Sequence, residues 1–261
     1  MASSVLPAPG TAVPRNLIAT MFGRIAPGYD AANRALSFGV DALWRRRLVR
    51  GVERAFLPGS SRRILDLAAG TLEVSLALVR QVPGASVIAL DFCLPMLQAG
   101  RAKLARAGAF ERSRVRFAAG NGLCLPLADC SVDAVTVSFG LRNILPRSAA
   151  MAEARRVLAP GGTLHILEFG SAGKRILGGL YNLYLTRVLP YLGGLIAGDA
   201  AAYAYLARSV TAFPTAEELG EELREAGFTQ VAWQRLWGGI VYLHTGQKGG
   251  ERAATDAMDA V

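Results

Sequence analysis

Hydrophobic and polar positions follow two alternating rhythms along most of this chain. Short apolar runs are typical of buried strands, and between them apolar side chains recur at helical spacing. The runs expected as strands are 62–67, 86–91, 115–120, 132–138, 163–168, 229–236 and 240–246. The segments expected as helices are 72–81, 96–107, 149–158 and 215–226. This alternation predicts an α/β fold with a doubly wound, mostly parallel, seven-stranded sheet covered by helices on both faces.

Two segments depart from this rhythm. Residues 16–56 form amphipathic helical patterns before the first strand, and residues 173–210 are too long for a simple crossover. The apolar part of the second segment is interrupted by Arg187, Pro190 and several glycines, whereas a membrane span needs about 20 apolar residues. We therefore expect a helical lid over an apolar pocket, or an interfacial helix.

The two ends of the chain lack a periodic apolar face. Residues 1–15 are rich in Pro, Ala and Ser, and residues 249–261 are small and polar. Both are expected to be flexible tails, which leaves residues 16–248 as a single domain. The N-terminus shows no basic segment followed by an apolar one, so no secretory signal is expected and a cytoplasmic location is favoured.

The charge balance is basic, with 29 Lys+Arg against 20 Asp+Glu and a formal net charge of +9. Most of the cations are arginine, with a cluster at Arg45, Arg46, Arg47, Arg50 and Arg54. The excess fits either a preference for arginine on solvated faces or attraction to anionic membranes or nucleic acid. Nucleic acid is disfavoured because no aromatic residues are interleaved with the cations to stack bases.

Metal-binding residues are sparse. Cys93, Cys124 and Cys130 form no CxxC pair, and His165 and His244 are far apart. A zinc site needs clustered ligands, so no metal is expected. An odd, low cysteine count suits a reducing compartment.

The strongest local signal for a ligand is a turn of small residues after the first strand. It reads Asp66-Leu-Ala-Ala-Gly70-Thr71, and about 20 residues further on Asp91 ends the second strand. Small residues let a ligand approach the backbone, and a strand-end acid accepts hydrogen bonds from ribose hydroxyls. This pair fits a dinucleotide or S-adenosylmethionine. The turn is not GxGxxG and contains no basic residue, which favours S-adenosylmethionine.

Polar residues also follow the third and fourth strands. Asn121 can hydrogen-bond an adenine edge, and the neighbouring leucines can cover the face of the ring. The sequence Ser-Phe-Gly-Leu-Arg-Asn closes the fourth strand at residues 138–143. In an open α/β sheet, this edge is where a substrate meets the cofactor.

With these motifs, the chain resembles the ubiquinone/menaquinone biosynthesis C-methyltransferases, which belong to the class I S-adenosylmethionine-dependent methyltransferases. The resemblance runs from about residue 21 to residue 248. It rests on the Asp66 turn and on the segments 21–30, 44–49, 138–143, 156–162 and 203–214. It implies methyl transfer from S-adenosylmethionine to a ring carbon of a polyprenyl quinol, with demethylmenaquinol as the expected acceptor. A ubiquinone-pathway benzoquinol, another small aromatic or lipid acceptor, and a non-catalytic scaffold are the alternatives.

The resemblance also implies roles for individual residues. Gly70 and Thr71 approach the methionine moiety, Asp91 holds the ribose, and Asn121 with Gly122 borders the adenine, while Ser138 lines the floor of the cofactor site. On the substrate side, Arg142 suits stabilisation of a ring oxyanion, Asn143 orients the ring oxygen, and Tyr29 closes over the site next to Asp30. Because an arginine stays protonated and cannot act as the base, a water or a nearby carboxylate takes the proton of the ring hydroxyl.

The turn departs from the family pattern. The usual Gly-Thr-Gly-Asp reads Gly-Thr-Leu72-Glu73 here. If residue 72 needs a positive φ, leucine is costly there, whereas in the first helical turn it is harmless.

The expected acceptor carries an isoprenoid tail, which also implies contact between the protein and a membrane surface. We expect the tail to lie along Tyr181, Tyr184, Tyr191 and Leu192, and Trp44 with its neighbouring arginines to rest on anionic headgroups at the inner face of the membrane. A homodimer is compatible with the sequence.

Overall fold

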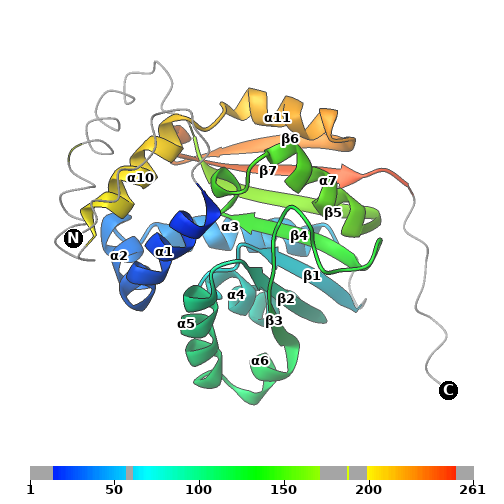
Figure 1. The fold of residues 1–261 in the computed structure, drawn as a ribbon. Helices are drawn as coiled ribbons and strands as arrows, with labels where there is room; N and C mark the ends of the chain where they lie inside the picture. Colours follow the sequence, from blue (N-terminus) through cyan, green and yellow to red (C-terminus); the bar gives the residue numbers. More distant parts are fainter. Residues whose placement is uncertain (1–13, 57–60, 171–186, 188–198, 251–261) are drawn as a thin grey trace.

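A seven-stranded sheet forms the centre of the molecule (Figure 1). The structure is a computed structural model that describes residues 14–56, 61–170, 187 and 199–250. The strands are β1 (Arg62–Leu67), β2 (Ala85–Asp91), β3 (Val115–Ala119), β4 (Val132–Ser138), β5 (Leu158–Phe169), β6 (Phe228–Leu236) and β7 (Val241–Lys248). Their order is β3-β2-β1-β4-β5-β7-β6, with β7 antiparallel to both of its neighbours and the other pairs parallel. The predicted doubly wound, mostly parallel sheet is confirmed.

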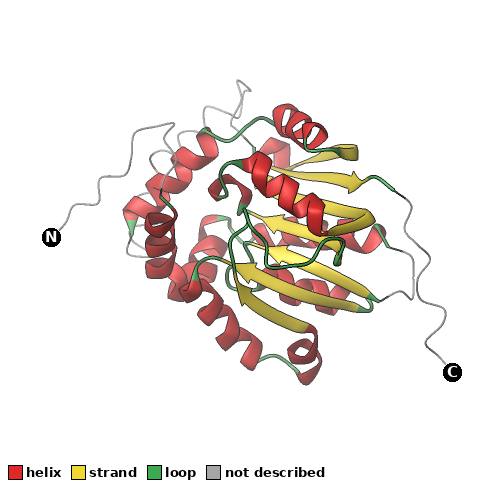
Figure 2. Ribbon diagram, turned by 45° about the vertical axis from the view of Figure 1, so that its right-hand side comes forward, coloured by secondary structure: helices red, strands yellow, loops and turns green. Residues whose placement is uncertain are grey.

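Helices cover both faces of this sheet (Figure 2). Alternate strand residues face two separate apolar cores, so that Ile64 packs with α3 and α4 whereas Leu65 packs with α7 and α11. The helices are α1 (Arg15–Ile25), α2 (Tyr29–Leu36), α3 (Asp41–Arg54), α4 (Glu73–Gln81), α5 (Leu94–Ala105), α6 (Ala109–Arg114), α7 (Arg147–Val157), α10 (Ala200–Thr211) and α11 (Ala216–Glu225), with short 3₁₀ turns η1 (Ala26–Gly28), η2 (Leu141–Asn143) and η4 (Trp237–Gly239).

A third apolar cluster joins elements that are far apart in the sequence. Ile18, Met21 and Leu36 from the N-terminal helices pack with Tyr203 and Tyr205 of α10. Figure 1 shows α1, α2 and α10 side by side at one side of the sheet. The N-terminal helices and α10 therefore form one packed unit.

The structure corrects the predicted elements at the start of β5 and at α6. β5 begins at Leu158 and runs through Pro160-Gly161-Gly162, which were expected to separate a helix from a strand starting at residue 163. The pairing of β4 with β5 shifts register at this point, and Gly161 adopts φ +71°, so the glycines form an irregularity inside the strand rather than a break. The other correction is α6, which was not predicted because it buries no residue and so leaves no apolar stripe.

Several expectations fall on residues outside the described ranges. These are the N-terminal tail up to residue 13, the tail from residue 251, most of the insertion at 173–210, and the tail-lining Tyr181, Tyr184, Tyr191 and Leu192. The part of the insertion from Ala200 onward is helical. Within the described ranges, no helix combines the length and apolar content needed to cross a bilayer.

Candidate active site

The ends of β1 and β2 bring the small-residue turn and Asp91 together. Asp91 Oδ2 accepts a hydrogen bond from the backbone N–H of Gly70 at 2.8 Å, and Oδ1 accepts one from the N–H of Cys93 at 2.8 Å. Asp91 is buried, and this burial raises the pKa of its carboxyl. Each carboxylate oxygen has a second lone pair, so Asp91 can hold the turn and still accept hydrogen bonds from ribose hydroxyls.

A pocket opens beside Asp91 and collects four of the residues proposed from the sequence. Asp91, Asn121, Gly122 and Asn143 line it together, with Leu123 and Ile144 as apolar walls. A Cβ on Gly122 would lie 3.1 Å from Ile144 Cδ1, so a side chain there would crowd the wall. These four residues lie close together because each lies at or just after the carboxyl end of a parallel strand.

The turns after β1 and β4 touch each other closely. Ala68 adopts φ +58° and Phe139 φ +56°, and a Cβ on Gly140 would lie 2.4 Å from the Cβ of Ala68. Ser138 ends β4 at this point, and its hydroxyl is buried without a hydrogen-bond partner among the described residues. A buried hydroxyl of this kind normally has a partner. The acceptor carboxylate, the tight turn and the unpaired Ser138 hydroxyl together fit S-adenosylmethionine.

Thr71 contacts the segment that opens the fold. Its hydroxyl donates to Asp30 Oδ1 at 2.6 Å, and Lys103 Nζ binds Asp30 Oδ2 at 2.6 Å and also pairs with Glu73. Asp30 therefore connects α2 to the turn after β1. Its neighbour Tyr29 is half-buried in an edge-to-face contact with Phe22, with ring centroids 6.1 Å apart. Closure of Tyr29 over the site stays a prediction.

Arg142 lies in a structural salt bridge, which was the alternative to its oxyanion role, and the sequence did not identify its partner, Glu168. Its Nη1 is 2.9 Å from Glu168 Oε2, and the two side chains are 5% and 1% exposed. Glu168 Oε1 also accepts from the backbone N–H of Arg142 at 3.3 Å, and Oε2 accepts from that of Phe169 at 3.1 Å. Glu168 was detectable as an acid at the end of an apolar strand, in the same position as Asp91 at the end of its own strand. The oxyanion role of Arg142 stays a prediction.

The expectation for Trp44 was wrong. Its side chain is buried, 6.1 Å from the ring of Phe139 and 6.3 Å from that of Phe169 by centroids, rather than exposed to headgroups. Trp44 shares the inward face of α3 with Leu48 and Val52. A large indole stabilises the fold more by burial than at the surface, and the four-residue spacing of these apolar side chains already indicated the inward face.

Comparison with known proteins identifies the family of this chain. The sequence matches the ubiE/COQ5 methyltransferase family over residues 11–248. The chain belongs to that family. The predicted family, enzyme class and cofactor, S-adenosylmethionine, are confirmed.

Among its relatives are proteins named for quinone methylation. The chain is 46% identical to a demethylmenaquinone methyltransferase of Thermus thermophilus, over 87% of this chain and 100% of that protein. It is 43% identical to a ubiquinone/menaquinone biosynthesis C-methyltransferase UbiE of Syntrophotalea carbinolica, over 87% of this chain and 92% of that protein.

Solved structures share the fold at low sequence identity. The [4+2]-cyclase SpnF has a TM-score of 0.64 at 16% identity, covering 94% of this chain and 99% of that one. An S-adenosylmethionine-dependent methyltransferase from Thermotoga maritima, described as a possible histamine N-methyltransferase, has a TM-score of 0.58 at 17% identity, covering 88% and 99%. These likenesses concern the fold alone.

Two conformations were considered for residue 72, a positive φ and an ordinary first helical turn. In this member of the ubiE/COQ5 family, Leu72 adopts the strained one, with positive φ. It adopts φ +67° immediately before α4 and is fully buried. A Cβ on Gly100 would lie 2.6 Å from Leu72 Cγ. The unusual leucine therefore fits because α5 carries a glycine opposite it.

This arrangement predicts that the stability effects of changes at positions 72 and 100 depend on each other. Leu72→Gly is expected to destabilise the protein by roughly 1–3 kcal/mol, because the lost burial of leucine outweighs the relieved strain. Gly100→Ala is expected to destabilise the wild type through overpacking. In the Leu72→Gly background the same change is expected to cost less, because only the 3.2 Å contact with the backbone carbon of Thr71 remains and the helix propensity of alanine, about 0.5–1 kcal/mol, offsets it. Urea unfolding of the four proteins measures this, and equal costs of Gly100→Ala in both backgrounds would contradict it.

Asp66 is buried within β1 beneath the turn. Ser75 Oγ donates to its Oδ2 at 2.6 Å and Thr136 Oγ1 donates to its Oδ1 at 2.9 Å. Despite these bonds, burial raises the pKa of Asp66 to about 6. The folded protein therefore favours the protonated carboxyl more than the unfolded chain does.

The raised pKa of Asp66 predicts a pH-dependent stability. This stabilisation is complete below the unfolded pKa of 3.8 and is lost as the pH rises through about 6, amounting to roughly 3 kcal/mol. Asp66→Asn is expected to lack this trend. Buried His165, whose pKa is lowered to about 4, gives the opposite trend in both proteins and cancels in their difference. Urea unfolding of both proteins between pH 4 and pH 7 measures it, and parallel pH profiles would refute the assignment.

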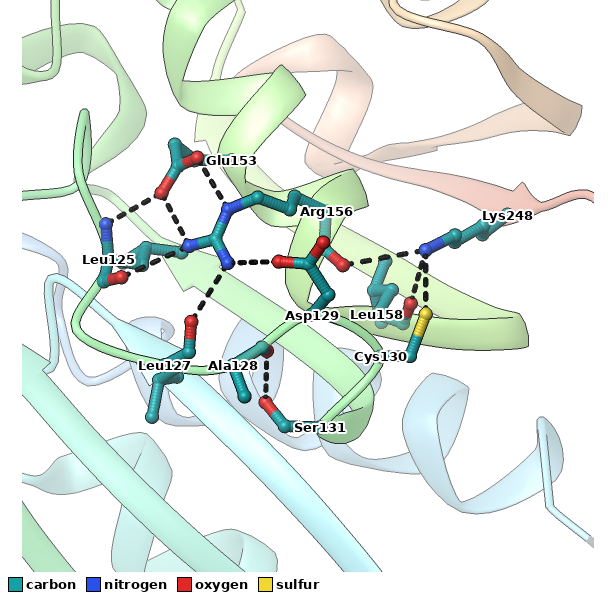
Figure 3. A network of polar contacts seen from close by, with 10 residues as sticks. All are labelled: Leu125, Leu127, Ala128, Asp129, Cys130, Ser131, Glu153, Arg156, Leu158 and Lys248. Carbon is teal, nitrogen blue, oxygen red and sulfur yellow. Dashed lines mark hydrogen bonds and ion pairs between the residues drawn. The ribbon is translucent and has the colours of Figure 1, made fainter.

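Arg156 holds the chain that follows Asn121 and Gly122 (Figure 3). Its guanidinium donates to the carbonyls of Leu125 and Leu127 at 3.0 and 2.8 Å and pairs with Glu153 and Asp129. Glu153 in turn accepts the N–H of Leu125 at 2.7 Å. One side chain of α7 thereby fixes the loop on the expected adenine side of the pocket.

Proposed function

We propose that this chain transfers the methyl group of S-adenosylmethionine to a ring carbon of demethylmenaquinol in menaquinone biosynthesis. What carries the proposal is its 46% identity, over the whole length of that protein, to a demethylmenaquinone methyltransferase. The pocket lined by Asp91, Asn121 and Asn143 supports it, because cofactor and acceptor groups then share one edge of the sheet.

The chemistry needs an electron-rich ring carbon in a dry, oriented site. When bound, S-adenosylmethionine supplies an electrophilic methyl group on its sulfonium. Loss of a proton from a ring hydroxyl, to a water or a nearby carboxylate, places charge on the ortho carbon that accepts the methyl. The sulfur would keep the electron pair of the broken bond as a neutral thioether, and loss of the C–H proton from the methylated carbon restores the aromatic ring. Asn143 orients the ring oxygen in the pocket, and Tyr29 closes over the ring.

Arg142 and Glu168 act on the same turn. The ion pair anchors the guanidinium and holds η2, which carries Asn143. Arg142 supplies the positive charge that stabilises the ring oxyanion at this edge. On the cofactor side, Gly70 and Thr71 meet the methionine moiety, Asn121 and Gly122 border the adenine, and Ser138 forms the floor.

Calorimetry of the purified protein with S-adenosylmethionine tests the first step. Adding a short-tailed demethylmenaquinol should then give the mass gain of one methyl group. Cofactor binding without transfer to it would point to another acceptor, and a demethylated benzoquinol is the first to try. Absence of cofactor binding would sink the proposal in favour of a scaffold.

A polyprenyl tail would keep the proposed acceptor in a membrane, and α3 carries a surface that suits contact with one. Arg46, Arg47, Arg50 and Arg54 are exposed along the outer face of this helix. At its N-terminal end, Phe38 is 83% exposed and Leu43 47% exposed. Cations beside exposed apolar side chains suit an anionic lipid surface. We propose peripheral contact with the inner face of the membrane through this face; a homodimer stays a prediction.

Co-flotation with vesicles tests the membrane contact. The protein is expected to float with anionic vesicles at low salt and to be released at high salt. Replacing Arg46, Arg47 and Arg50 by Gln should abolish flotation. The matched triple change of the exposed Arg101, Arg106 and Arg116, which lie on α5, just after it and on β3, should leave flotation intact. Failure of the wild type to float with anionic vesicles at low salt would refute the proposed membrane contact through α3.

A further inference from the structure

The hydroxyl of Tyr205 joins α10 to the candidate site. It donates a hydrogen bond to Asn143 Oδ1 at 2.8 Å, across 62 residues of sequence. Tyr205 is buried at 8% exposure and belongs to the cluster that packs α10 on α1 and α2. Asn143 lines the pocket next to Asp91. Tyr205 does not line the pocket itself, but it binds Asn143, which does.

The direction of this hydrogen bond decides which end of the Asn143 amide is available. An asparagine amide has an acceptor oxygen and a nitrogen that donates twice. The amide oxygen can only accept, so the Tyr205 hydroxyl is the donor, and burial raises the pKa of Tyr205, which keeps this hydroxyl protonated. Oδ1 keeps a second lone pair, but its hydrogen bond to Tyr205 turns it toward α10 and leaves the two N–H groups of Nδ2 to donate to a ligand. A ring oxygen that gains negative charge needs such a donor.

We propose that Tyr205 is a positioning residue for methyl transfer: its hydroxyl fixes the Asn143 amide so that Nδ2 donates to the ring oxygen of the acceptor. This inference rests on the proposed function. In it, α10 does more than cover the sheet edge, because it sets the orientation of a group that touches the substrate.

Tyr203 provides a matched control on the same helix. It is 3% exposed, and its hydroxyl is buried with no hydrogen-bond partner among the described residues. Tyr203→Phe and Tyr205→Phe each remove one buried hydroxyl from α10. If the tyrosines serve only to dock this helix, the two changes should act alike.

The experiment measures kcat and KM with S-adenosylmethionine and a short-tailed demethylmenaquinol. Asn143→Ala is expected to lower kcat by about 100-fold, as loss of an oxyanion donor does. Tyr205→Phe is expected to lower kcat by about tenfold while the KM for S-adenosylmethionine stays within about twofold, because the amide remains but turns. Tyr203→Phe should keep the wild-type kcat. The double change Tyr205→Phe/Asn143→Ala should match Asn143→Ala alone, because Tyr205 then has nothing to orient.

Three results would overturn this inference alone: wild-type kcat in Tyr205→Phe, equal losses in Tyr203→Phe and Tyr205→Phe, or fully multiplicative losses in the double variant. A wild-type protein that binds S-adenosylmethionine but leaves demethylmenaquinol unmethylated would overturn the proposed function, and this inference with it. The wild-type assay thus separates the two failures.

Discussion

Replacing Glu168 with alanine is expected to destabilise the folded protein by about 3–5 kcal/mol. The change leaves the guanidinium of Arg142 buried without its counter-charge and removes the acceptor of two backbone N–H groups. Most of this cost arises from the stranded charge rather than from the lost contact. Urea unfolding followed by circular dichroism measures it.

Two companion variants separate charge from packing. Glu168→Gln keeps an acceptor oxygen for one of the two backbone N–H groups and should lose less stability than Glu168→Ala. Adding Arg142→Met to Glu168→Ala should recover much of the loss, because replacing both members of a buried pair by apolar groups is close to neutral. If Glu168→Ala has the same urea midpoint as the wild type, the ion pair makes no measurable contribution to the free energy of unfolding.

Asp91→Ala is expected to weaken binding of S-adenosylmethionine by about 1–3 kcal/mol, which corresponds to roughly 5- to 150-fold in Kd. The variant loses the acceptor for the ribose and also releases the N–H groups of Gly70 and Cys93, which Asp91 now holds. The turn that approaches the cofactor then loses its anchor.

Calorimetric titration of the cofactor measures this affinity. Glu221→Ala removes one negative charge from an exposed ion pair with Arg224 on α11 and should leave the Kd unchanged. An unchanged Kd in Asp91→Ala would remove Asp91 from the site, whereas equal weakening in both variants would assign the effect to net charge.

The fold followed from the sequence where burial on two faces makes a pattern. Residues such as Ile64 and Leu65 are neighbours in the chain but belong to opposite cores, so the strand reads as a continuous apolar run. The start of β5 did not follow, because Pro160-Gly161-Gly162 has the composition of a break and the pairing with β4 carries it through. Propensity is local, whereas strand pairing is a tertiary interaction.

The candidate site divides in the same way. Asp91, Asn121 and Asn143 could be placed together because each follows a parallel strand, and such ends share one edge. The partners of Tyr205 and Glu168 could not be predicted, because a contact between distant segments produces no characteristic residue spacing in the sequence. The φ of Leu72 was open for a related reason: the glycine that accommodates this leucine lies on another helix.

The contact between Ala68 and Gly140 restricts how this chain can vary. The two turns have room for one methyl group between them, and Ala68 occupies it. Position 68 can shrink on its own, but position 140 can grow only if position 68 becomes glycine first. The two positions are therefore expected to change in a fixed order during evolution, with the intermediate that carries alanine at both of them excluded by overlap.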